Sequence, residues 1–368
     1  MKKVLFININ QIESISGIEK YCIKLAKIFN DLNWEVSEAA LIKSNDESNE
    51  LLTHRYVFLD KKVFVKKNKL FRIFTHRIFF EKQINKLLKQ NKYDLIINNT
   101  NIDFKKISSN DNYIYVQHFD TKFVLYSNLL SNFKEKLRAL IFKSLLFIFN
   151  QRTPILHSKN IVSPYNGFIQ KKYLKATTNY FYIAIPYDNL KQNFDFNIQN
   201  KYKKNFLYLG RIDQWQKNIL YLNKYFDNID FYGDDFDKDV TKKLKDKYKG
   251  VLLDTQSIEN VFNNHSFLIM SSFYEGFGMV LGESFANGTP IICSNKITSK
   301  DFFLKYKENG FELDIDKEPS ELINSINNLT FDEYDKMCHS VFEFAQKYLS
   351  LEEFNKKWLY IISSCKLK

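Results

Sequence analysis

Short apolar runs alternate with stretches of helical periodicity along the first half of the chain. Apolar residues at 4–7 and 35–42 flank a helical pattern at 18–32, which is the start of a βαβ unit. We expect further strands at 56–59, 95–98, 113–117, 161–163 and 182–185, and a second helix at 71–90. The pattern therefore predicts an α/β domain that ends near Pro186.

A polar stretch separates this first alternation from a second one. Residues 189–204 are rich in Asn, Gln and Lys and show no periodicity, so we place a linker there. Beyond it we expect strands at 206–209, 231–232, 251–253, 267–270 and 290–293, and a closing helix at 351–363. The sequence thus predicts two α/β domains, at 1–188 and 205–350, that face each other across a cleft.

Glycine is scarce in this chain and unevenly distributed. The 368 residues include 10 Gly and 5 Pro, which excludes collagen-like and low-complexity chains. Four glycines, at 276, 278, 282 and 288, fall within 13 residues, so that segment needs local backbone freedom. The 4 cysteines lie far apart without a CxxC pair, so the sequence indicates neither a zinc site nor a disulfide framework. This is the pattern expected of a protein in a reducing cytosol. The apolar runs are too short to cross a bilayer, and the first residues indicate a strand instead of a signal peptide.

Positive charge is concentrated in the first half of the chain. The net charge is +12, and residues 1–190 hold 30 Lys and Arg against 16 Asp and Glu, whereas the rest of the chain is slightly acidic. Segments 61–80 and 133–149 interleave these cations with apolar residues, a pattern typical of helices on anionic membrane surfaces. For 133–149 a core helix with one solvated side explains the pattern equally well. A nucleic-acid partner is not expected, because no reader motif accompanies the charge.

The segment 271–295 (SSFYEGFGMVLGESFANGTPIICSN) carries the first candidate chemistry. It indicates a strand, a glycine-bearing turn and a helix that begins around 277–279, whose free N–H groups favour an anion. Glu275 and Glu283 frame this turn and have no lysine close by in the sequence. They are either solvated surface carboxylates or groups that bind paired sugar hydroxyls.

A second candidate element follows the first strand of the second domain. Gly210 and Arg211 come directly after that strand, and Lys217 follows in RIDQWQKN. Two cations at the end of a strand suit a diphosphate, with Arg as a bidentate fork and Lys as a point charge. An exposed basic loop is the alternative. The chain contains neither a GxGxxG turn after its first strand nor a Walker lysine motif.

Taken together, GRIDQWQKN and EGFGMVLGE resemble the nucleotide-sugar site of the retaining glycosyltransferases of family 4, which have the GT-B fold. SGIEK at 16–20 is similar to the family's Gly-Gly-x-Glu loop, with Ser16 in place of the first glycine. AIPYDN at 184–189 is similar to the family's Ile-Pro-Asn stretch. The resemblance implies two Rossmann-like domains and a C-terminal helix at 351–368 that crosses back to the first domain.

The resemblance also implies roles for individual residues. Arg211 and Lys217 would neutralise the donor diphosphate, Glu283 would hold the ribose and Glu275 the transferred sugar. His118, in YVQHFD, matches a histidine near the reacting sugar and completes the catalytic set with Glu275, Arg211 and Lys217. The rest of the donor-binding set is Gly17, Gly210, Gly276, Phe277, Gly278 and Met279.

The expected activity is the retaining transfer of a hexose or N-acetylhexosamine from a UDP-linked donor. The acceptor would be a glycan or a lipid-linked glycan in bacterial lipopolysaccharide or surface polysaccharide synthesis. No DxD-type strand end is present, so we expect no metal and no other cofactor. We expect a cytoplasmic protein, peripheral on the inner face of the membrane. A catalytically silent GT-B scaffold partner and a nucleotide-sugar epimerase are the alternatives.

Overall fold

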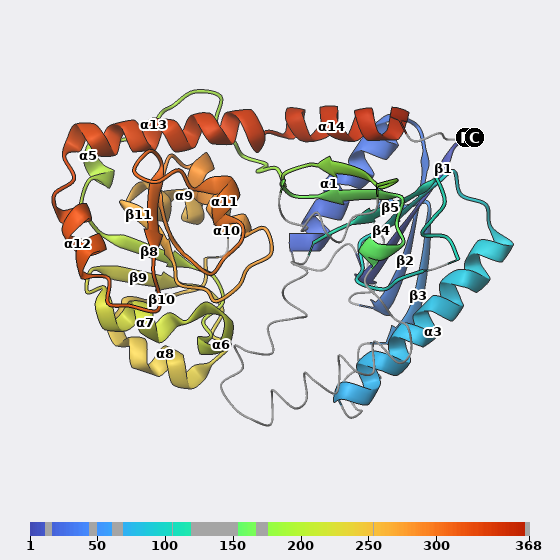
Figure 1. Ribbon diagram of the computed structural model, residues 1–368, viewed down its shortest axis with the longest axis horizontal. Coiled ribbons are helices and arrows are strands. Elements are labelled where there is room, and N and C mark those ends of the chain that lie inside the picture. The colour runs from blue at the N-terminus through green and yellow to red at the C-terminus, as the bar shows by residue number, and fades with distance from the viewer. Residues whose placement is uncertain are drawn as a thin grey trace. The chain divides into compact units, whose positions relative to one another are not determined.

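The computed structural model describes residues 1–11, 17–43, 50–60, 69–104, 106–118, 154–166, 176–252 and 254–364. The chain forms two compact units, one made of Met1–Ile183 with Asn355–Lys368 and the other of Ala184–Phe354. Each unit contains one parallel sheet (Figure 1). In the described part of the chain, no helix is both long enough and apolar enough to cross a bilayer.

The sheet of the first unit has seven parallel strands in the order β3-β2-β1-β4-β5-β6-β7. The strands are β1 (Lys3–Asn10), β2 (Glu35–Lys43), β3 (His54–Asp60), β4 (Leu95–Asn98), β5 (Tyr113–Val116), β6 (Asn160–Ser163) and β7 (Asn179–Tyr182). The helical elements are α1 (Gly17–Asp31), α3 (Lys69–Gln90) and the 3₁₀ turn η3 (Pro154–Leu156). Helix α1 joins β1 to β2 and buries Leu25 and Phe29, which explains its apolar periodicity.

The sheet of the second unit has six parallel strands in the order β10-β9-β8-β11-β12-β13. They are β8 (Phe206–Leu209), β9 (Ile229–Tyr232), β10 (Tyr248–Gly250), β11 (Phe267–Met270), β12 (Ile291–Ser294) and β13 (Gly310–Leu313). The helices are α5 (Ile198–Lys201), α6 (Gln214–Lys217), α7 (Ile219–Tyr225), α8 (Lys238–Leu244), η5 (Lys245–Lys247), α9 (Thr255–Asn263), α10 (Met279–Ala286), α11 (Lys300–Phe303), α12 (Ser320–Asn327), α13 (Phe331–Tyr348) and α14 (Leu351–Ser364).

Both sheets are doubly wound, which confirms the predicted α/β class. The strand order reverses beside β1 in the first unit and beside β8 in the second. Ligands of such sheets bind outside the carboxyl ends of the strands at this switch point. The candidate residues that follow β8 and its neighbour β11 therefore belong to one edge of one sheet.

The elements missed or displaced by sequence reasoning lie toward the sheet edges. The strand expected at 182–185 is β7, three residues earlier, and the one expected at 251–253 is β10. Edge strands have one unpaired side and bury less, so their apolar pattern is weak; β7 has no buried position. The sequence did not predict β13, whose run of four residues includes an exposed glutamate.

Helix α14 begins in the second unit, and from Asn355 onward it belongs to the first. Its Trp358 is fully buried there, and the indole Nε1 donates a hydrogen bond to the hydroxyl of Tyr21 at 3.1 Å. Tyr21 lies on α1, so the closing helix packs against the helix that follows β1.

The predicted linker at 189–204 lies within the second unit, which begins at Ala184. Its polar composition hides a buried residue, Lys201, whose Nζ donates to the carbonyl oxygens of Phe262 at 2.8 Å and Asn287 at 3.0 Å. It also donates to the hydroxyl of Thr289 at 2.6 Å. These carbonyls lie at the carboxyl ends of α9 and α10, where a cation is favoured by the helix dipoles.

Lys201→Met is expected to lower the free energy of unfolding by about 3 kcal/mol, because it removes the three hydrogen bonds that the buried Nζ donates. Urea denaturation followed by circular dichroism measures the change. The control is Lys203→Met, since Lys203 is exposed and two positions away. Equal stability of the two variants would show that water replaces the lysine.

Candidate functional site

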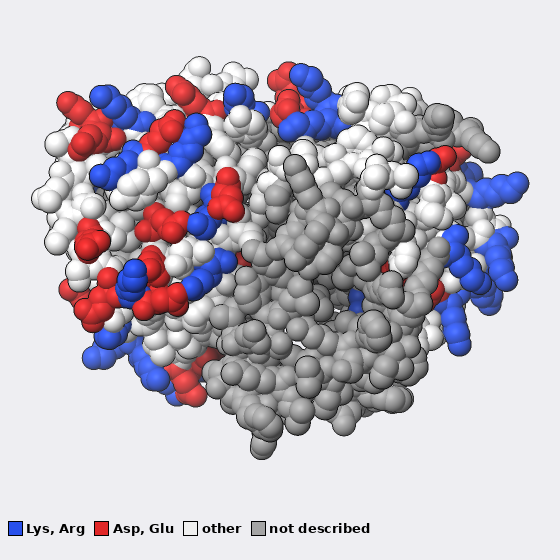
Figure 2. Space-filling view, in the orientation of Figure 1, with Lys and Arg blue, Asp and Glu red and all other residues white. Residues whose placement is uncertain are grey.

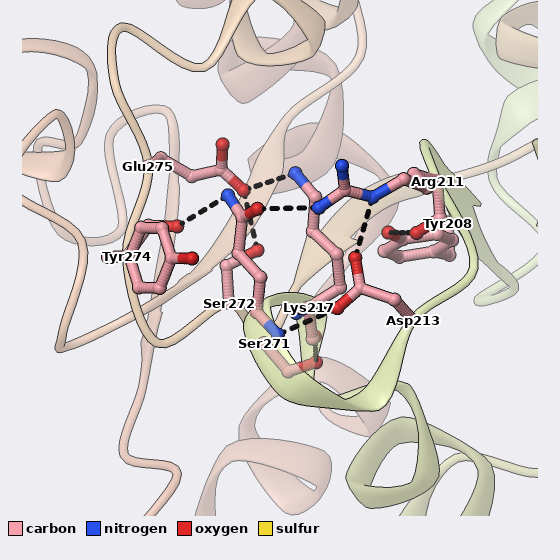
Figure 3. Close-up of polar contacts among 9 residues, drawn as sticks. Tyr208, Arg211, Asp213, Lys217, Ser271, Ser272, Tyr274 and Glu275 are labelled. Carbon is pink, nitrogen blue, oxygen red and sulfur yellow. Dashed lines mark hydrogen bonds and ion pairs between the residues drawn. The ribbon is translucent and has the colours of Figure 1, made fainter. Parts of the chain in front are cut away.

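Asp213 organises the loop that follows β8. Its Oδ1 accepts hydrogen bonds from the backbone N–H groups of Gln216 at 2.7 Å and Lys217 at 3.4 Å, so it caps the short helix α6. Its Oδ2 accepts from Nε of Arg211 at 2.8 Å (Figure 3). One buried carboxylate therefore sets both the start of α6 and the orientation of the guanidinium.

Arg211 is held on several sides but remains open to a ligand. Its Nη2 donates to the side-chain oxygen of Gln216 at 2.8 Å, and Gln216 in turn donates to the carbonyl of Tyr274 at 3.2 Å. The guanidinium also lies over the ring of Phe236, 4.6 Å from its centroid. The Arg211 side chain is 40% exposed, so an anion can reach it.

Lys217 and Glu275 form an ion pair across the two loops. The lysine Nζ lies 2.5 Å from Oε1 of Glu275, which also accepts from the hydroxyl of Ser272 at 2.7 Å. Their side chains are 15% and 9% exposed. The sequence offered no lysine near Glu275, and the partner comes from 58 positions away because β8 and β11 are neighbours in the sheet.

The two loops are also tied together through the backbone. The hydroxyl of Ser271 donates to the carbonyl oxygens of Lys217 at 2.9 Å and Asn218 at 3.1 Å. The N–H of Phe273 donates to the carbonyl of Gln216 at 2.9 Å. These bonds fix the positions from which Lys217 and Glu275 extend toward each other (Figure 3).

The turn after Glu275 leads into α10. Gly278 is the N-cap residue with φ +74°, a left-handed conformation that favours glycine, and Met279 is the first helical residue. No side chain of the described chain caps this helix, so its first turn offers N–H groups to an anion. Gly276 lies in the turn itself, and the buried Phe277 anchors the turn by packing against Phe303, 5.1 Å between ring centroids.

Glu283 lies in the second turn of α10 and is half-buried. It is close enough to Tyr187 to add to the rise in the pKa of that phenol, which burial chiefly raises to about 12. Gly210 completes the second-unit set, directly after β8. The structure thus brings Gly210, Arg211, Lys217, Glu275 and the start of α10 to the switch point of the second sheet.

Two candidates, Gly17 and His118, belong to the first unit. Gly17 is the first residue of α1, and burial of the nearby Glu19 raises the pKa of its carboxyl. His118 follows β5, and its Nε2 lies 3.0 Å from Oδ1 of Asn99. Burial lowers the pKa of His118 to about 3, so the ring is neutral at physiological pH. The segment 133–149 and residues 61–75 of the other basic segment lie outside the residues whose side chains the structure describes.

Sequence reasoning missed the residues that hold the site together. Asp213, Gln216 and Ser272 each bond a candidate side chain directly. Only Asp213 carried a signal, because an acidic residue just before a helix is a common N-cap. In the described ranges, no three His, Cys, Asp or Glu side chains gather closely enough to hold a metal ion.

Comparison with known proteins finds similarity in both sequence and structure. Residues 191–348 match the family model of the glycosyl transferases group 1. The structure of WaaG, a glycosyltransferase involved in lipopolysaccharide biosynthesis, has a TM-score of 0.69 and 11% identity, covering 98% of this chain and 100% of WaaG. The lipopolysaccharide outer core galactosyltransferase WaaB has a TM-score of 0.66 and 14% identity, covering 98% and 99%.

HepE of Anabaena, solved in complex with UDP and glucose, has a TM-score of 0.63 and 16% identity, covering 99% of this chain and 100% of HepE. No curated protein matches the sequence. At these identities the structural similarity establishes the fold alone. The two doubly wound units and the matched structures agree with the GT-B fold expected from the sequence.

Proposed function

We propose that this chain is a retaining glycosyltransferase that takes a hexose or N-acetylhexosamine from a UDP-linked donor. The observation that carries the proposal is the joint placement of Arg211, Lys217, Glu275 and the uncapped start of α10 at one sheet edge. The match of residues 191–348 to the glycosyl transferases group 1 model supports it. The UDP and glucose bound in the similar HepE structure support the choice of donor.

In this mechanism the second unit stabilises the charge that develops on the departing diphosphate. Arg211 supplies a bidentate fork and Lys217 a point charge, and the first N–H groups of α10 add a dipole. Each preorganised donor contributes about 3 to 4 kcal/mol to the transition state. Glu275 accepts hydrogen bonds from hydroxyls of the transferred sugar, and Glu283 from those of the ribose. The acceptor hydroxyl attacks the front face, its proton passes to the departing phosphate, and no metal ion is required.

The proposed acceptor is a glycan or a lipid-linked glycan of a bacterial surface polysaccharide or lipopolysaccharide, bound at the cytoplasmic face of the membrane. The described part of the first unit supports a basic surface there, since Lys82, Lys86 and Lys89 are exposed on α3. Their spacing places them along one side of the helix. Figure 2 shows Lys and Arg gathered where α3 lies, whereas the second unit shows mixed charges.

The function is tested by incubating the protein with a panel of nucleotide sugars and measuring donor consumption with and without an acceptor extract. We expect turnover of a UDP-sugar that EDTA does not inhibit and that an acceptor accelerates. Binding without turnover would favour the scaffold alternative. Conversion of the donor to an isomer without any acceptor would favour the epimerase alternative.

Association with anionic vesicles is expected to depend strongly on salt. The protein should sediment with phosphatidylglycerol vesicles at low ionic strength and be released at high salt, because each surface cation contributes only about 1 kcal/mol. Vesicles of phosphatidylcholine are the control. The triple variant Lys82→Gln, Lys86→Gln, Lys89→Gln should bind the vesicles more weakly. Unchanged sedimentation of that variant would show that α3 is not part of the membrane-binding surface.

A further inference from the structure

A row of polar contacts crosses the first sheet from β3 and ends at His118. On β3, Nε of Arg55 lies 3.3 Å from Oε2 of Glu38, which is on β2 and fully buried. Oε1 of Glu38 accepts from Nδ2 of Asn8 on β1 at 2.8 Å. Oδ1 of Asn8 accepts from Nδ2 of Asn99, after β4, at 3.0 Å, and Oδ1 of Asn99 faces Nε2 of His118 at 3.0 Å.

The row has a fixed direction, because its first acidic member can only accept. The guanidinium of Arg55 beside Glu38 favours the ionised carboxylate, which accepts hydrogen bonds and has no proton to donate. Asn8 must therefore turn its NH₂ group toward Glu38 and its oxygen toward Asn99. The thiol of Cys22, 3.6 Å from the same oxygen of Asn8, adds a second weak donor to it.

The same argument determines which nitrogen of the His118 imidazole carries the proton. With its NH₂ group directed at Asn8, Asn99 presents an oxygen to His118. The nitrogen that faces this oxygen has to carry the proton, since a bare ring nitrogen would oppose two lone pairs. The backbone keeps Asn99 in place, because its N–H donates to the carbonyl of Ile7 on β1 at 3.0 Å.

We propose that Glu38, Asn8 and Asn99 are positioning residues that hold His118 as its Nε2–H tautomer, so that Nδ1 accepts a hydrogen bond from a substrate hydroxyl. The substrate part rests on the function proposed above, whereas the tautomer follows from the first unit alone. A hydroxyl-bearing ligand fits this chemistry because a neutral imidazole nitrogen accepts but does not attract anions.

The ring plane of His118 is fixed from a second side. The ring packs edge-on against Tyr21, with centroids 5.0 Å apart. Tyr21 is buried and accepts the hydrogen bond from Trp358 of α14. Because burial keeps the pKa of His118 far below neutrality, the ring occupies one of two neutral tautomers at physiological pH, and the hydrogen-bond row selects between them.

Long-range ¹H–¹⁵N correlation spectra of the full-length protein labelled with ¹⁵N-histidine test the tautomer. One imidazole, identified by its loss in His118→Gln, should show a protonated Nε2 and an unprotonated Nδ1. His157 serves as an internal reference for a protonated Nδ1, because its Nδ1 lies 2.6 Å from Oδ2 of Asp103. A protonated Nδ1 on His118 would overturn the proposal.

Glu38→Gln tests whether Glu38 sets the tautomer of His118 through the two asparagines. The amide oxygen of the new side chain would face Arg55 and its NH₂ group would face Asn8, so both asparagines flip and His118 changes to the Nδ1–H tautomer. The matched control is Glu35→Gln on the same strand, since Glu35 pairs with Lys3 and His54 and touches no member of the row. An unchanged His118 tautomer in folded Glu38→Gln would overturn the proposed role of Glu38.

Asn99→Asp covers the case in which Glu38→Gln does not fold. A carboxylate beside Nε2 should raise the pKa of His118 into the range that NMR titration measures, and an unaffected ring would overturn the contact. In the transfer assay Glu38→Gln should lower kcat/KM about tenfold, the value of one hydrogen bond. A changed tautomer with unchanged transfer would overturn the hydroxyl role, and a wild-type protein without transferase activity would leave the NMR result intact.

Discussion

Replacing Lys217 by methionine is expected to lower the rate of sugar transfer by about 100- to 1,000-fold, the usual cost of one preorganised charge donor. The ammonium lies beside Glu275 at the switch point of the second sheet, where the diphosphate charge would develop. Initial rates with a radiolabelled UDP-sugar at saturating donor measure the loss. An unchanged rate would contradict the proposed site.

A double variant separates the catalytic effect of Lys217 from its structural effect. Lys217→Met alone leaves the Glu275 carboxylate, 9% exposed, without its cation and should lower the free energy of unfolding by about 2 kcal/mol. Lys217→Met with Glu275→Gln removes both charges and should recover most of that stability but no activity. Recovery of transfer in the double variant would mean that Lys217 only neutralises Glu275.

Gly233→Ala is expected to lower the stability of the second unit and to weaken donor binding as well. Gly233 follows β9 with φ +144°, and a Cβ there would lie 1.8 Å from the carbonyl oxygen of Gly210. The clash is with backbone, so the turn that carries Arg211 must move. We expect a loss of about 3 kcal/mol in the free energy of unfolding and at least tenfold weaker UDP binding, measured by calorimetry.

Gly250→Ala is the matched control for this substitution. Gly250 also has a positive φ, +97°, but nothing lies within 4 Å of its would-be Cβ. The Gly250→Ala variant should therefore lose about 1 kcal/mol in the free energy of unfolding through backbone strain and bind UDP normally. Equal losses in the two variants would show that strain, and not the displacement of Gly210, accounts for the effect.

The sequence predicted candidate site residues where a single short motif contains them. Arg211 and Glu275 lie in the loops that follow two apolar strands, and the carboxyl ends of parallel strands meet at one edge of the sheet. The pairing of Lys217 with Glu275 could not be predicted from the sequence, because it depends on β8 and β11 being neighbours in the sheet. The sequence also indicated a linker around Lys201, because the groups that it contacts are more than 60 positions away in the chain.

The row that ends at His118 shows the same limit in the first unit. Asn8 and Glu38 stand in strands whose remaining residues are mostly apolar, so the sequence indicated only buried strands there. The alignment of these residues follows from register, in which Glu38 is paired with Phe6 on one side and Arg55 on the other. A register that joins strands far apart in the chain leaves no mark in local sequence patterns.

Ion pairs within the second unit neutralise the two cations of its proposed donor site. Arg211 is paired with Asp213, and Lys217 with Glu275, so each cation already has an intramolecular counter-ion. The cluster therefore exerts little long-range attraction on anions in general. A ligand gains from it only by reaching the guanidinium and the ammonium together while giving Glu275 a new donor. A free diphosphate offers no such donor but a sugar hydroxyl does, so charge balance by itself favours the intact nucleotide sugar over its diphosphate fragment.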